Sequence, residues 1–300
     1  MADQEYRVAP PGFSREQWDE FQEEGMLVIE NALTGEECDR YCDMIDAAAQ
    51  RSEKYDPDKF FGPNNIVERY PEFAELIDHP RHVGFMHDVY GELLKMHISQ
   101  IFLRPRDTSR NKWHPDGARA LPYSVFSPAL PIQIKIAYWL TDLPEEEMGN
   151  FVYMPGSHKG QYFDFYDTHE HVEGEKILCP KRGTMTFMHC NTWHRVAPNN
   201  TDAVRKNIFL AYCPSWICEA DRHQCSPEWL DTLNREQRII MRSYNGGYAR
   251  TKPAASEFPL FLDRETGSDR DVGVWPEHVE LHRRKRLTTV EKFQMESVQV

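Results

Sequence analysis

The chain lacks the features that mark several large classes of protein. No stretch of its 300 residues approaches about 18 consecutive apolar positions, so the sequence predicts no membrane-spanning helix. The opening MADQEYRVAP contains acidic residues and no apolar core, which is not typical of a secretory signal. The formal net charge of -13 argues against a nucleic-acid binder, because such proteins usually carry a basic surface.

Cysteine is sparse, and internal repeats and low-complexity tracts are missing. Seven cysteines, an odd number, are spread over a long chain, which favours reduced thiols and a cytoplasmic location over a disulfide framework. Cys38 and Cys42 stand one helical turn apart and could bind a metal as a pair. Two small residues on a buried helix face is the favoured interpretation.

Histidine is the one residue type in excess. The chain has thirteen, within a composition that is 40% hydrophobic and 12% aromatic and can therefore form a real core. Histidine is the common transition-metal ligand and the common acid–base group, so some of the thirteen could be functional. His79, His82 and His87 show no tight metal spacing, and we expect them at the surface or at helix ends.

The first third of the chain predicts helices. Two capping boxes, in which Ser or Thr is followed three residues later by Gln or Glu, each open an amphipathic segment. They begin at Ser14 and Thr34 and predict helices that end near residues 24 and 50. A short buried strand is expected at 26–29, and helical signals return over 70–95.

From about residue 98 the pattern becomes that of β-structure. Isoleucines alternate with other residues from Ile132 to Ile136, which predicts a strand with two distinct faces. Further strands, separated by turn signals, are expected at 151–154, 183–189 and 208–213. Strands that follow a helical start predict an α+β fold, an antiparallel barrel or sandwich with helices packed on one side.

The strongest chemical motif is Trp113-His114-Pro115-Asp116, where the β region begins. A histidine and a carboxylate two residues apart on a strand point to the same face and can hold one metal ion from one side. Alone the motif is weak, because thirteen histidines and twenty aspartates in 300 residues produce about one His-x-Asp by chance. Trp113, next to a ligand candidate, is expected to face away and pack in the core, and so is Trp193.

A second segment, 183–212, strengthens this motif. It contains His194 and, eleven residues later, Arg205. Two histidines and one aspartate form the facial triad that binds Fe(II) and leaves positions open for a chelating cosubstrate and oxygen. An arginine on a neighbouring strand can bind a carboxylate through two parallel hydrogen bonds, as a dicarboxylate such as 2-oxoglutarate would require.

Five stretches resemble those of a known family: FQEEGMLVIENAL, IDHPRHVGFMHDVYG, WHPDG, YWLTDLPEEEMGNFVYMPGSHKG and WHRVAPNNTDAVRKN. The chain is similar over roughly residues 13–216 to the phytanoyl-CoA dioxygenase family of Fe(II)/2-oxoglutarate oxygenases. The resemblance implies a double-stranded β-helix, that is, a jelly-roll or cupin-like barrel. We therefore expect a single domain over 1–300, with N-terminal helical support at 13–97, the jelly-roll core at 98–216 and a helical or irregular C-terminal extension at 217–300. A helix is expected in the extension at about 227–243.

The resemblance also implies a role for each residue of the motif. His114, Asp116 and His194 match the iron ligands, and Arg205 matches the residue that pairs with the distal carboxylate of 2-oxoglutarate. Arg104 stands near a second basic position of the family and is a candidate for the same cosubstrate. The implied reaction uses Fe(II), 2-oxoglutarate and O₂ and releases succinate and CO₂. The carboxylate of Asp116 favours hydroxylation, because related halogenases lack it so that halide can bind iron.

The chain departs from the family at two positions. Met148-Gly149 stands where the family usually has Asn-Gly, and Val196 stands where a serine often helps to hold the cosubstrate. His189, five residues before His194, is interpreted as structural, because the spacing to Arg205 fits His194. Lys135 could face inward, toward an anion, or outward into solvent, and the sequence favours neither.

The substrate is expected to be a small molecule selected by loops at 52–66 and 117–131 and after Trp216. The chain ends SVQV without a peroxisomal signal, which argues against phytanoyl-CoA and favours a natural-product tailoring hydroxylase. Two other classes stay open: a cupin-type metal enzyme that does not use 2-oxoglutarate, and a non-catalytic jelly-roll that binds a ligand. The sequence is also compatible with a homo-oligomer.

Overall fold

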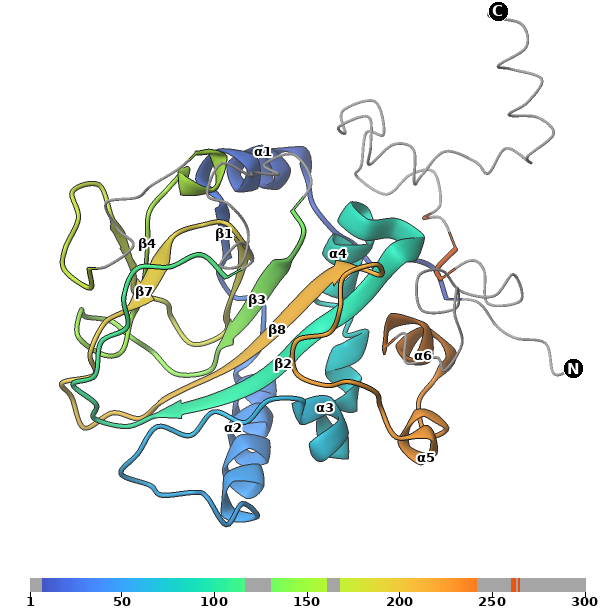
Figure 1. Cartoon of the computed structure of the whole chain (residues 1–300), viewed down its shortest axis with the longest axis horizontal. Helices are drawn as coiled ribbons and strands as arrows, with labels where there is room; N and C mark the ends of the chain where they lie inside the picture. Colours follow the sequence, from blue (N-terminus) through green and yellow to red (C-terminus); the bar gives the residue numbers. More distant parts are fainter. Residues whose placement is uncertain (1–6, 117–130, 161–167, 242–259, 263, 265–300) are drawn as a thin grey trace, which may run out of the picture.

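Two antiparallel sheets form the centre of the computed structural model, which describes residues 7–116, 131–160, 168–241, 260–262 and 264 (Figure 1). The larger sheet has the strand order β1-β6-β3-β8-β2 and the smaller one the order β5-β4-β7. The large sheet consists of β1 (Met26–Ile29), β6 (Thr184–His189), β3 (Ile134–Trp139), β8 (Arg205–Pro214) and β2 (Leu94–Arg104). The small sheet consists of β5 (Lys176–Leu178), β4 (Phe151–Tyr153) and β7 (His194–Val196).

The helices come mainly from the N-terminal part of the chain, and both expected capping boxes are present. Ser14 accepts from Gln17 N–H at the start of the first helix, and Thr34 accepts from Glu37 N–H at the start of the second. The α-helices are α1 (Arg15–Glu24), α2 (Gly35–Gln50), α3 (Ile66–Arg69), α4 (Val83–Tyr90), α5 (Pro227–Leu230) and α6 (Arg235–Met241). The 3-10 helices are η1 (Pro71–Ile77), η2 (Gly91–Leu93) and η3 (Ser157–Lys159).

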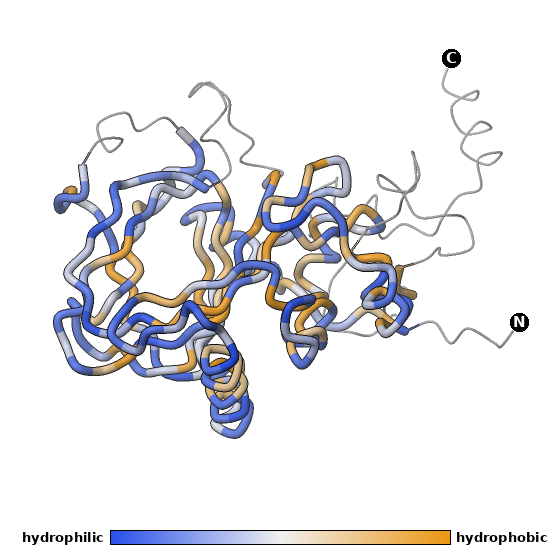
Figure 2. The backbone as a smooth tube through the Cα atoms, turned by 60° about the horizontal axis from the view of Figure 1, so that its bottom comes forward, coloured by the Kyte–Doolittle hydropathy of each residue, from blue (hydrophilic) through white to orange (hydrophobic). Residues whose placement is uncertain are grey.

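The two faces of the large sheet pack against different parts of the molecule. On β3, Ile136 and Tyr138 belong to the apolar core that includes the N-terminal helices, and the ring of Tyr41 on α2 lies 6.2 Å from that of Tyr138. Ala137 and Trp139 point to the opposite, inner face, where they pack with residues of the small sheet. Figure 2 shows hydrophobic segments running through the strands and hydrophilic ones at many of the turns. The expected α+β fold with antiparallel sheets is confirmed.

Two boundaries differ from the sequence prediction. The strand expected at 26–29 is present as β1, which joins the large sheet beside β6, whereas β2 begins at Leu94, before the expected start of the β region at about residue 98. The prediction of a single helix at 227–243 is wrong, because the helix is interrupted between α5 and α6. Asn234 and Gln237 exchange side-chain to backbone hydrogen bonds of 3.2 and 2.8 Å, which starts a new helix there.

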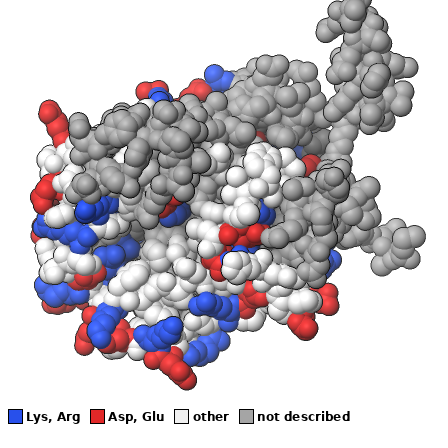
Figure 3. All heavy atoms as spheres, viewed as in Figure 1, with Lys and Arg blue, Asp and Glu red and all other residues white. Residues whose placement is uncertain are grey.

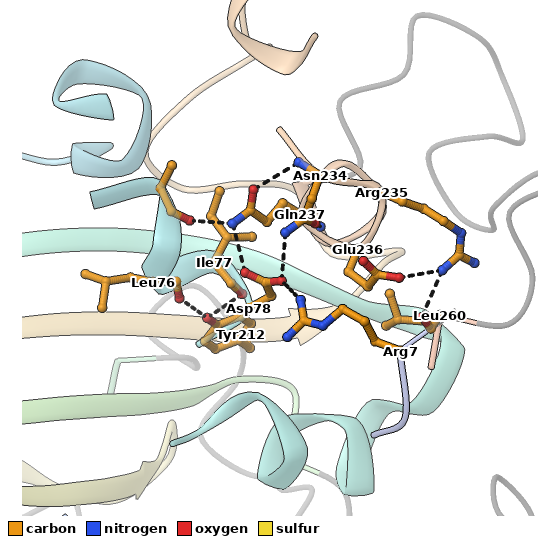
Figure 4. Close-up of polar contacts among 11 residues, drawn as sticks. Arg7, Leu76, Ile77, Asp78, Tyr212, Asn234, Arg235, Glu236, Gln237 and Leu260 are labelled. Atoms are coloured by element: carbon orange, nitrogen blue, oxygen red, sulfur yellow. Dashed lines mark hydrogen bonds and ion pairs between the residues drawn. The ribbon is translucent and has the colours of Figure 1, made fainter. Parts of the chain in front are cut away.

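Helix α6 is fixed to the rest of the molecule through the carboxylate of Asp78 (Figure 4). Gln237 donates to one oxygen of Asp78 at 2.8 Å, Asn234 donates to the other at 3.1 Å, and Arg7 forms an ion pair with it. These contacts join the start of the chain, η1 and α6. Most of the expected extension, at 242–259, 263 and 265–300, lies outside the described residues.

The surface mixes charges of both signs. On the face seen in Figure 3, which is the view of Figure 1, acidic and basic side chains of the described residues alternate, with no large area of one sign. Among the helices that the structure describes, none is long and apolar enough to cross a membrane.

His82 lies at a helix end, one of the two positions expected for it, because it is the N-cap residue of α4, but it is not at the surface. Its side chain is fully buried between the core helices and the sheet, with one ring nitrogen 2.6 Å from the Tyr138 hydroxyl and the other 2.7 Å from the Tyr212 hydroxyl. Two phenol groups on an apolar sheet face need polar partners, and a neutral imidazole supplies both a donor and an acceptor.

Replacing His82 by alanine should therefore lower the free energy of unfolding by about 2–5 kcal/mol, because it leaves buried hydroxyls short of partners and opens a cavity. Urea unfolding at pH 7 measures this. His171→Ala is the matched control, since that side chain is 75% exposed, and it should change the value by less than about 0.5 kcal/mol. A small effect at His82 would contradict a structural role.

The same histidine should contribute to acid sensitivity. Burial holds the pKa of His82 well below the ordinary 6.5, so the unfolded chain takes up this proton before the folded one does. The stability linked to neutral His82 is thus present above about pH 6.5 and falls as the pH drops below it. Unfolding curves between pH 7 and 5 should show a shallower loss in His82→Ala than in the wild type, and equal slopes would exclude this contribution.

Candidate metal and anion site

Backbone pairing brings the two candidate histidine ligands together. His114 N–H donates to the His194 carbonyl and His194 N–H donates to the His114 carbonyl, both at 3.0 Å. Residues that exchange both hydrogen bonds in this way present their side chains on the same face. Asp116 N–H donates to the Cys190 carbonyl at 2.9 Å, so the same two segments stay paired as far as the aspartate.

Each histidine is held in one tautomer by its own loop. The Nδ1 atom of His114 lies 2.7 Å from the carbonyl oxygen of Lys112, and that of His194 lies 2.9 Å from the carbonyl of Thr192. A carbonyl can only accept, so the proton sits on Nδ1 and the Nε2 lone pair is left for a metal.

The third ligand candidate completes the cluster. Asp116 oxygens lie 4.0 Å from His114 Nε2 and 3.8 Å from His194 Nε2. One ligand atom from each of the three residues falls within 4.8 Å of the others, and among the described residues this is the one group of three or more metal-binding side chains that do so. Three ligands from one side leave the other positions around an ion accessible.

The electrostatics favour the protonation states that metal binding needs. Burial lowers the pKa of His194 to about 3, so its imidazole is neutral near pH 7. Burial alone would raise the pKa of Asp116, but Lys135 and the two histidines hold it well below its usual range. The site thus presents a neutral imidazole at His194 and an ionised carboxylate at Asp116.

Lys135 settles the question that its sequence position left open. It points inward from β3, and its ammonium forms an ion pair with Asp116. It also lies 5.4 Å from the ring of Phe209 on the neighbouring strand β8. Whether a lysine on a strand faces in or out depends on the phase of the strand, which the alternating isoleucines did not fix for this residue.

Both tryptophans next to the ligands pack as expected. Trp113 and Trp193 are buried in a small apolar cluster behind the site. Arg195 stacks 5.3 Å from the Trp113 ring and pairs with Glu175 at 2.6 Å, which ties this cluster to the loop before β5. No pattern in the sequence indicated that Arg195 and Glu175 would hold this cluster in place.

Arg205 is the first residue of β8 and is almost completely buried on the inner face. It donates to the Gly149 carbonyl, and its guanidinium lies 5.8 Å from the Trp139 ring. Its Nε atom has no hydrogen-bond partner among the described residues. Burial, together with the charge of Arg104, lowers its pKa to about 9.

Arg104 stands directly across from Arg205 on β2. It pairs with Asp107 at 3.1 Å, and its Nε, like that of Arg205, has no partner in the described part of the chain. Gly149 makes room for this pair, because its φ of 79° suits glycine and a Cβ there would come within 2.9 Å of the Arg104 side chain. Two like charges on facing residues are unfavourable unless an anion joins them.

A cavity of about 200 Å³, counted to its open mouth, lies on the inner face between the two regions. Its walls include Lys135, which contacts Asp116, and Trp139, which contacts Arg205. These two residues are four positions apart on one strand, a span of about 13 Å. Apolar side chains line the stretch between them: Met26, Ala137, Phe151, Met188 and Phe209.

The other residues that the sequence singled out lie around the site or outside the described part of the chain. His189 is buried behind the site, 4.8 Å ring to ring from His158, and outside the ligand cluster, as the sequence indicated. The residue after Gly149, Asn150, bonds to the carbonyls of Glu145 and Leu178 and so stabilises this turn from within. The loop expected at 117–131 lies outside the described residues except for its last position, and Trp216 is exposed.

The fold and the site are thus two antiparallel sheets, a cluster of two histidines and one carboxylate that could hold a metal, and a buried arginine. The family model of phytanoyl-CoA dioxygenase (PhyH) matches residues 21–207, and the chain belongs to this family. The resemblance stated from the sequence is confirmed.

Several known proteins are similar to the chain. A probable alpha-ketoglutarate-dependent hypophosphite dioxygenase of Stutzerimonas stutzeri is 23% identical over 66% of this chain and 77% of its own length. HygX from Streptomyces hygroscopicus, solved with nickel and 2-oxoglutarate bound, aligns with a TM-score of 0.60 at 19% identity over 70% of this chain and 90% of its own. The carbocyclase SnoK from nogalamycin biosynthesis aligns with a TM-score of 0.55 at 22% identity over 69% and 87%. These structures support the fold.

If the cluster is a metal site, Asp116→Ala should weaken binding of Mn(II) by more than about 100-fold, because loss of a ligand exceeds the 10–100-fold effect of losing a supporting residue. Calorimetric titration of the metal-free protein measures the affinity. His169→Ala, a 44% exposed histidine in a charged loop, is the control and should bind like the wild type. Equal binding by the Asp116 variant would place the metal elsewhere.

Proposed function

We propose that the protein is an Fe(II)- and 2-oxoglutarate-dependent dioxygenase that oxidises an unactivated C–H bond of a small molecule. The observation that carries the proposal is the pairing of two features in one cavity. Lys135, which pairs with Asp116 of the histidine–aspartate cluster, lines one end, and Trp139, which contacts the buried Arg205 with its unsatisfied Nε, lines the other. A dicarboxylate with an adjacent keto group fits both ends.

The donor set suits Fe(II). Two neutral imidazoles and one carboxylate on one side of an ion are the ligands of non-haem iron oxygenases. Bound iron would supply the redox chemistry, in which O₂ converts 2-oxoglutarate to succinate and CO₂ and the second oxygen atom oxidises the substrate. The chain's residues fix where this takes place.

Each residue around the cavity has a definite part in this proposal. The carbonyls of Lys112 and Thr192 keep the two imidazoles in the metal-binding tautomer. Arg205 binds the distal carboxylate of the cosubstrate, and Arg104 adds positive charge behind it. Lys135 holds the carboxylate of Asp116 in its ionised form and fixes its direction. The apolar walls exclude water from the reacting groups.

The reaction is proposed to be hydroxylation. Asp116 fills the position that a halide would need, so the ligand set favours oxygen transfer to carbon. The similar proteins act on different compounds, with hypophosphite named for one and hygromycin B bound in another. A natural-product tailoring role is consistent with HygX and SnoK, and the substrate is proposed to be a small molecule bound at the open mouth of the cavity.

The finer description of the fold is part of the same proposal. The two facing sheets are proposed to form a double-stranded β-helix, with the site between them. The likeness to HygX and SnoK, at TM-scores of 0.60 and 0.55, supports this. The single-domain division, the cytoplasmic location and a homo-oligomeric state stay predictions.

The two alternatives fit the site less well. A cupin-type enzyme that does not use 2-oxoglutarate gives no role to the buried pair of arginines. A non-catalytic jelly-roll needs neither the fixed histidine tautomers nor an ionised Asp116. Both features require support from several residues, which favours an active iron site.

The binding half of the proposal is tested by mixing the anaerobic protein with Fe(II) and 2-oxoglutarate. Chelation should produce a weak visible charge-transfer band. Arg205→Ala should raise the 2-oxoglutarate concentration needed for half of this band by more than about 100-fold, since a charged hydrogen-bonding partner is removed from a buried site. Lys181→Ala, a 77% exposed cation, is the control. No band in the wild type would refute the proposal.

The catalytic half is tested by succinate release. With O₂ present, the wild type should release succinate slowly alone and faster with its substrate, and a compound library can be screened on this signal. Asp116→Ala should release none above background. Unchanged turnover in this variant would show that the chemistry does not depend on the cluster.

A further inference from the structure

Asn207 is the polar side chain that the fold leaves most conspicuously without a role. It is completely buried, and neither its Nδ2 nor its Oδ1 has a hydrogen-bond partner in the described structure. Natural proteins rarely bury an amide in this way, because both atoms lose their bonds to water. A hydrogen-bonding partner beyond the described residues would satisfy both atoms.

The position of Asn207 says where that partner lies. On β8 the side chains that face inward are Arg205, Asn207, Phe209 and Ala211, since alternate residues share a face. Ala211 is opposite Lys135, at the metal end, and Arg205 lies at the other end of the strand. Asn207 is thus one step from Arg205 along the inner face toward the metal.

The two residues directly across from Asn207 offer its amide no hydrogen bond. Trp139 on β3 and Phe102 on β2 stand directly across from it on either side. The indole N–H of Trp139 is used by the Thr186 hydroxyl at 3.2 Å, and Phe102 has no polar atom. Trp139 lines the cavity and also contacts the Arg205 guanidinium, so the amide lies on the same inner face as that guanidinium, one alternate position along the strand.

We infer that Asn207 is a second binding residue for the distal carboxylate of the cosubstrate, and that it helps the site to select a dicarboxylic 2-oxo acid over a monocarboxylic one. Its Nδ2–H donates to one carboxylate oxygen while Arg205 donates to the other. Farther along β8, Phe209 offers no polar atom, so the methylene groups meet an apolar wall. This inference rests on the proposed function.

The test compares two probes of equal length, 2-oxoglutarate and 2-oxovalerate, which lacks the distal carboxylate. Their affinities for the anaerobic Fe(II)-loaded protein are measured from the charge-transfer band. Asn207→Leu should weaken the binding of 2-oxoglutarate by about 10- to 100-fold, which is the effect of one hydrogen bond to a charged group. The affinity for 2-oxovalerate should stay unchanged. Asn207→Asp should weaken 2-oxoglutarate further, because it places a negative charge beside the carboxylate.

Thermal unfolding without cosubstrate separates binding from structure. Asn207→Leu removes a desolvated amide, so its Tm should equal or exceed that of the wild type. Ser99→Ala is the matched control, because it removes another buried, unpartnered polar group from the opposite face of the same sheet and should leave both affinities unchanged. A lower Tm of Asn207→Leu with unchanged 2-oxoglutarate affinity would show that the amide is structural, and would overturn the inference.

The outcomes also separate this inference from the proposed function. If the wild type shows no charge-transfer band with 2-oxoglutarate, the proposed function fails. If the wild type binds 2-oxoglutarate and prefers it to 2-oxovalerate, but Asn207→Leu keeps the same preference, the inference alone fails.

Discussion

The site depends on one backbone interaction, the mutual hydrogen bonds between His114 and His194. These residues are eighty positions apart, and the bond from Asp116 N–H to the Cys190 carbonyl continues the pairing of their segments. Once they are paired, the nearby carbonyls set the tautomers, and Asp116 follows at the next position of the same face. The small sheet supports this arrangement, since β7 begins at His194 and pairs with β4.

A second constraint is charge inside an apolar sheet. Arg104 and Arg205 face each other across two strands, and Lys135 faces the ligand cluster from the strand next to β8. Buried cations need anions, and the described residues supply them only in part, through Asp107 and Asp116. A dicarboxylate that joins the two arginines would supply the anion that they lack. The net charge of -13 says nothing about this local excess of positive charge.

Much of the site was predictable from sequence because its chemistry is local. His114 and Asp116 share a strand-like segment, and the spacing of His194 and Arg205 places them on β7 and β8, which are consecutive in the chain but lie in different sheets. The phase of Lys135, the burial of His82 and the isolation of Asn207 were not predictable. Each depends on residues from strands and helices distant in sequence, Tyr212 for His82 and Phe102 for Asn207. The break before α6 was missed although its cause is local, because Asn234 and Gln237 form a cap whose pattern the sequence contains.

In the proposed mechanism, the protein holds a metal at the histidine end of the cavity and a dicarboxylate at the arginine end. A crystal structure of the protein grown without oxygen in Mn(II) and 2-oxoglutarate tests it most directly. The account predicts an anomalous scattering peak among His114, Asp116 and His194, with 2-oxoglutarate extending from it to the guanidinium of Arg205. A metal peak bound by other side chains, or a cosubstrate that does not reach Arg205, would contradict it.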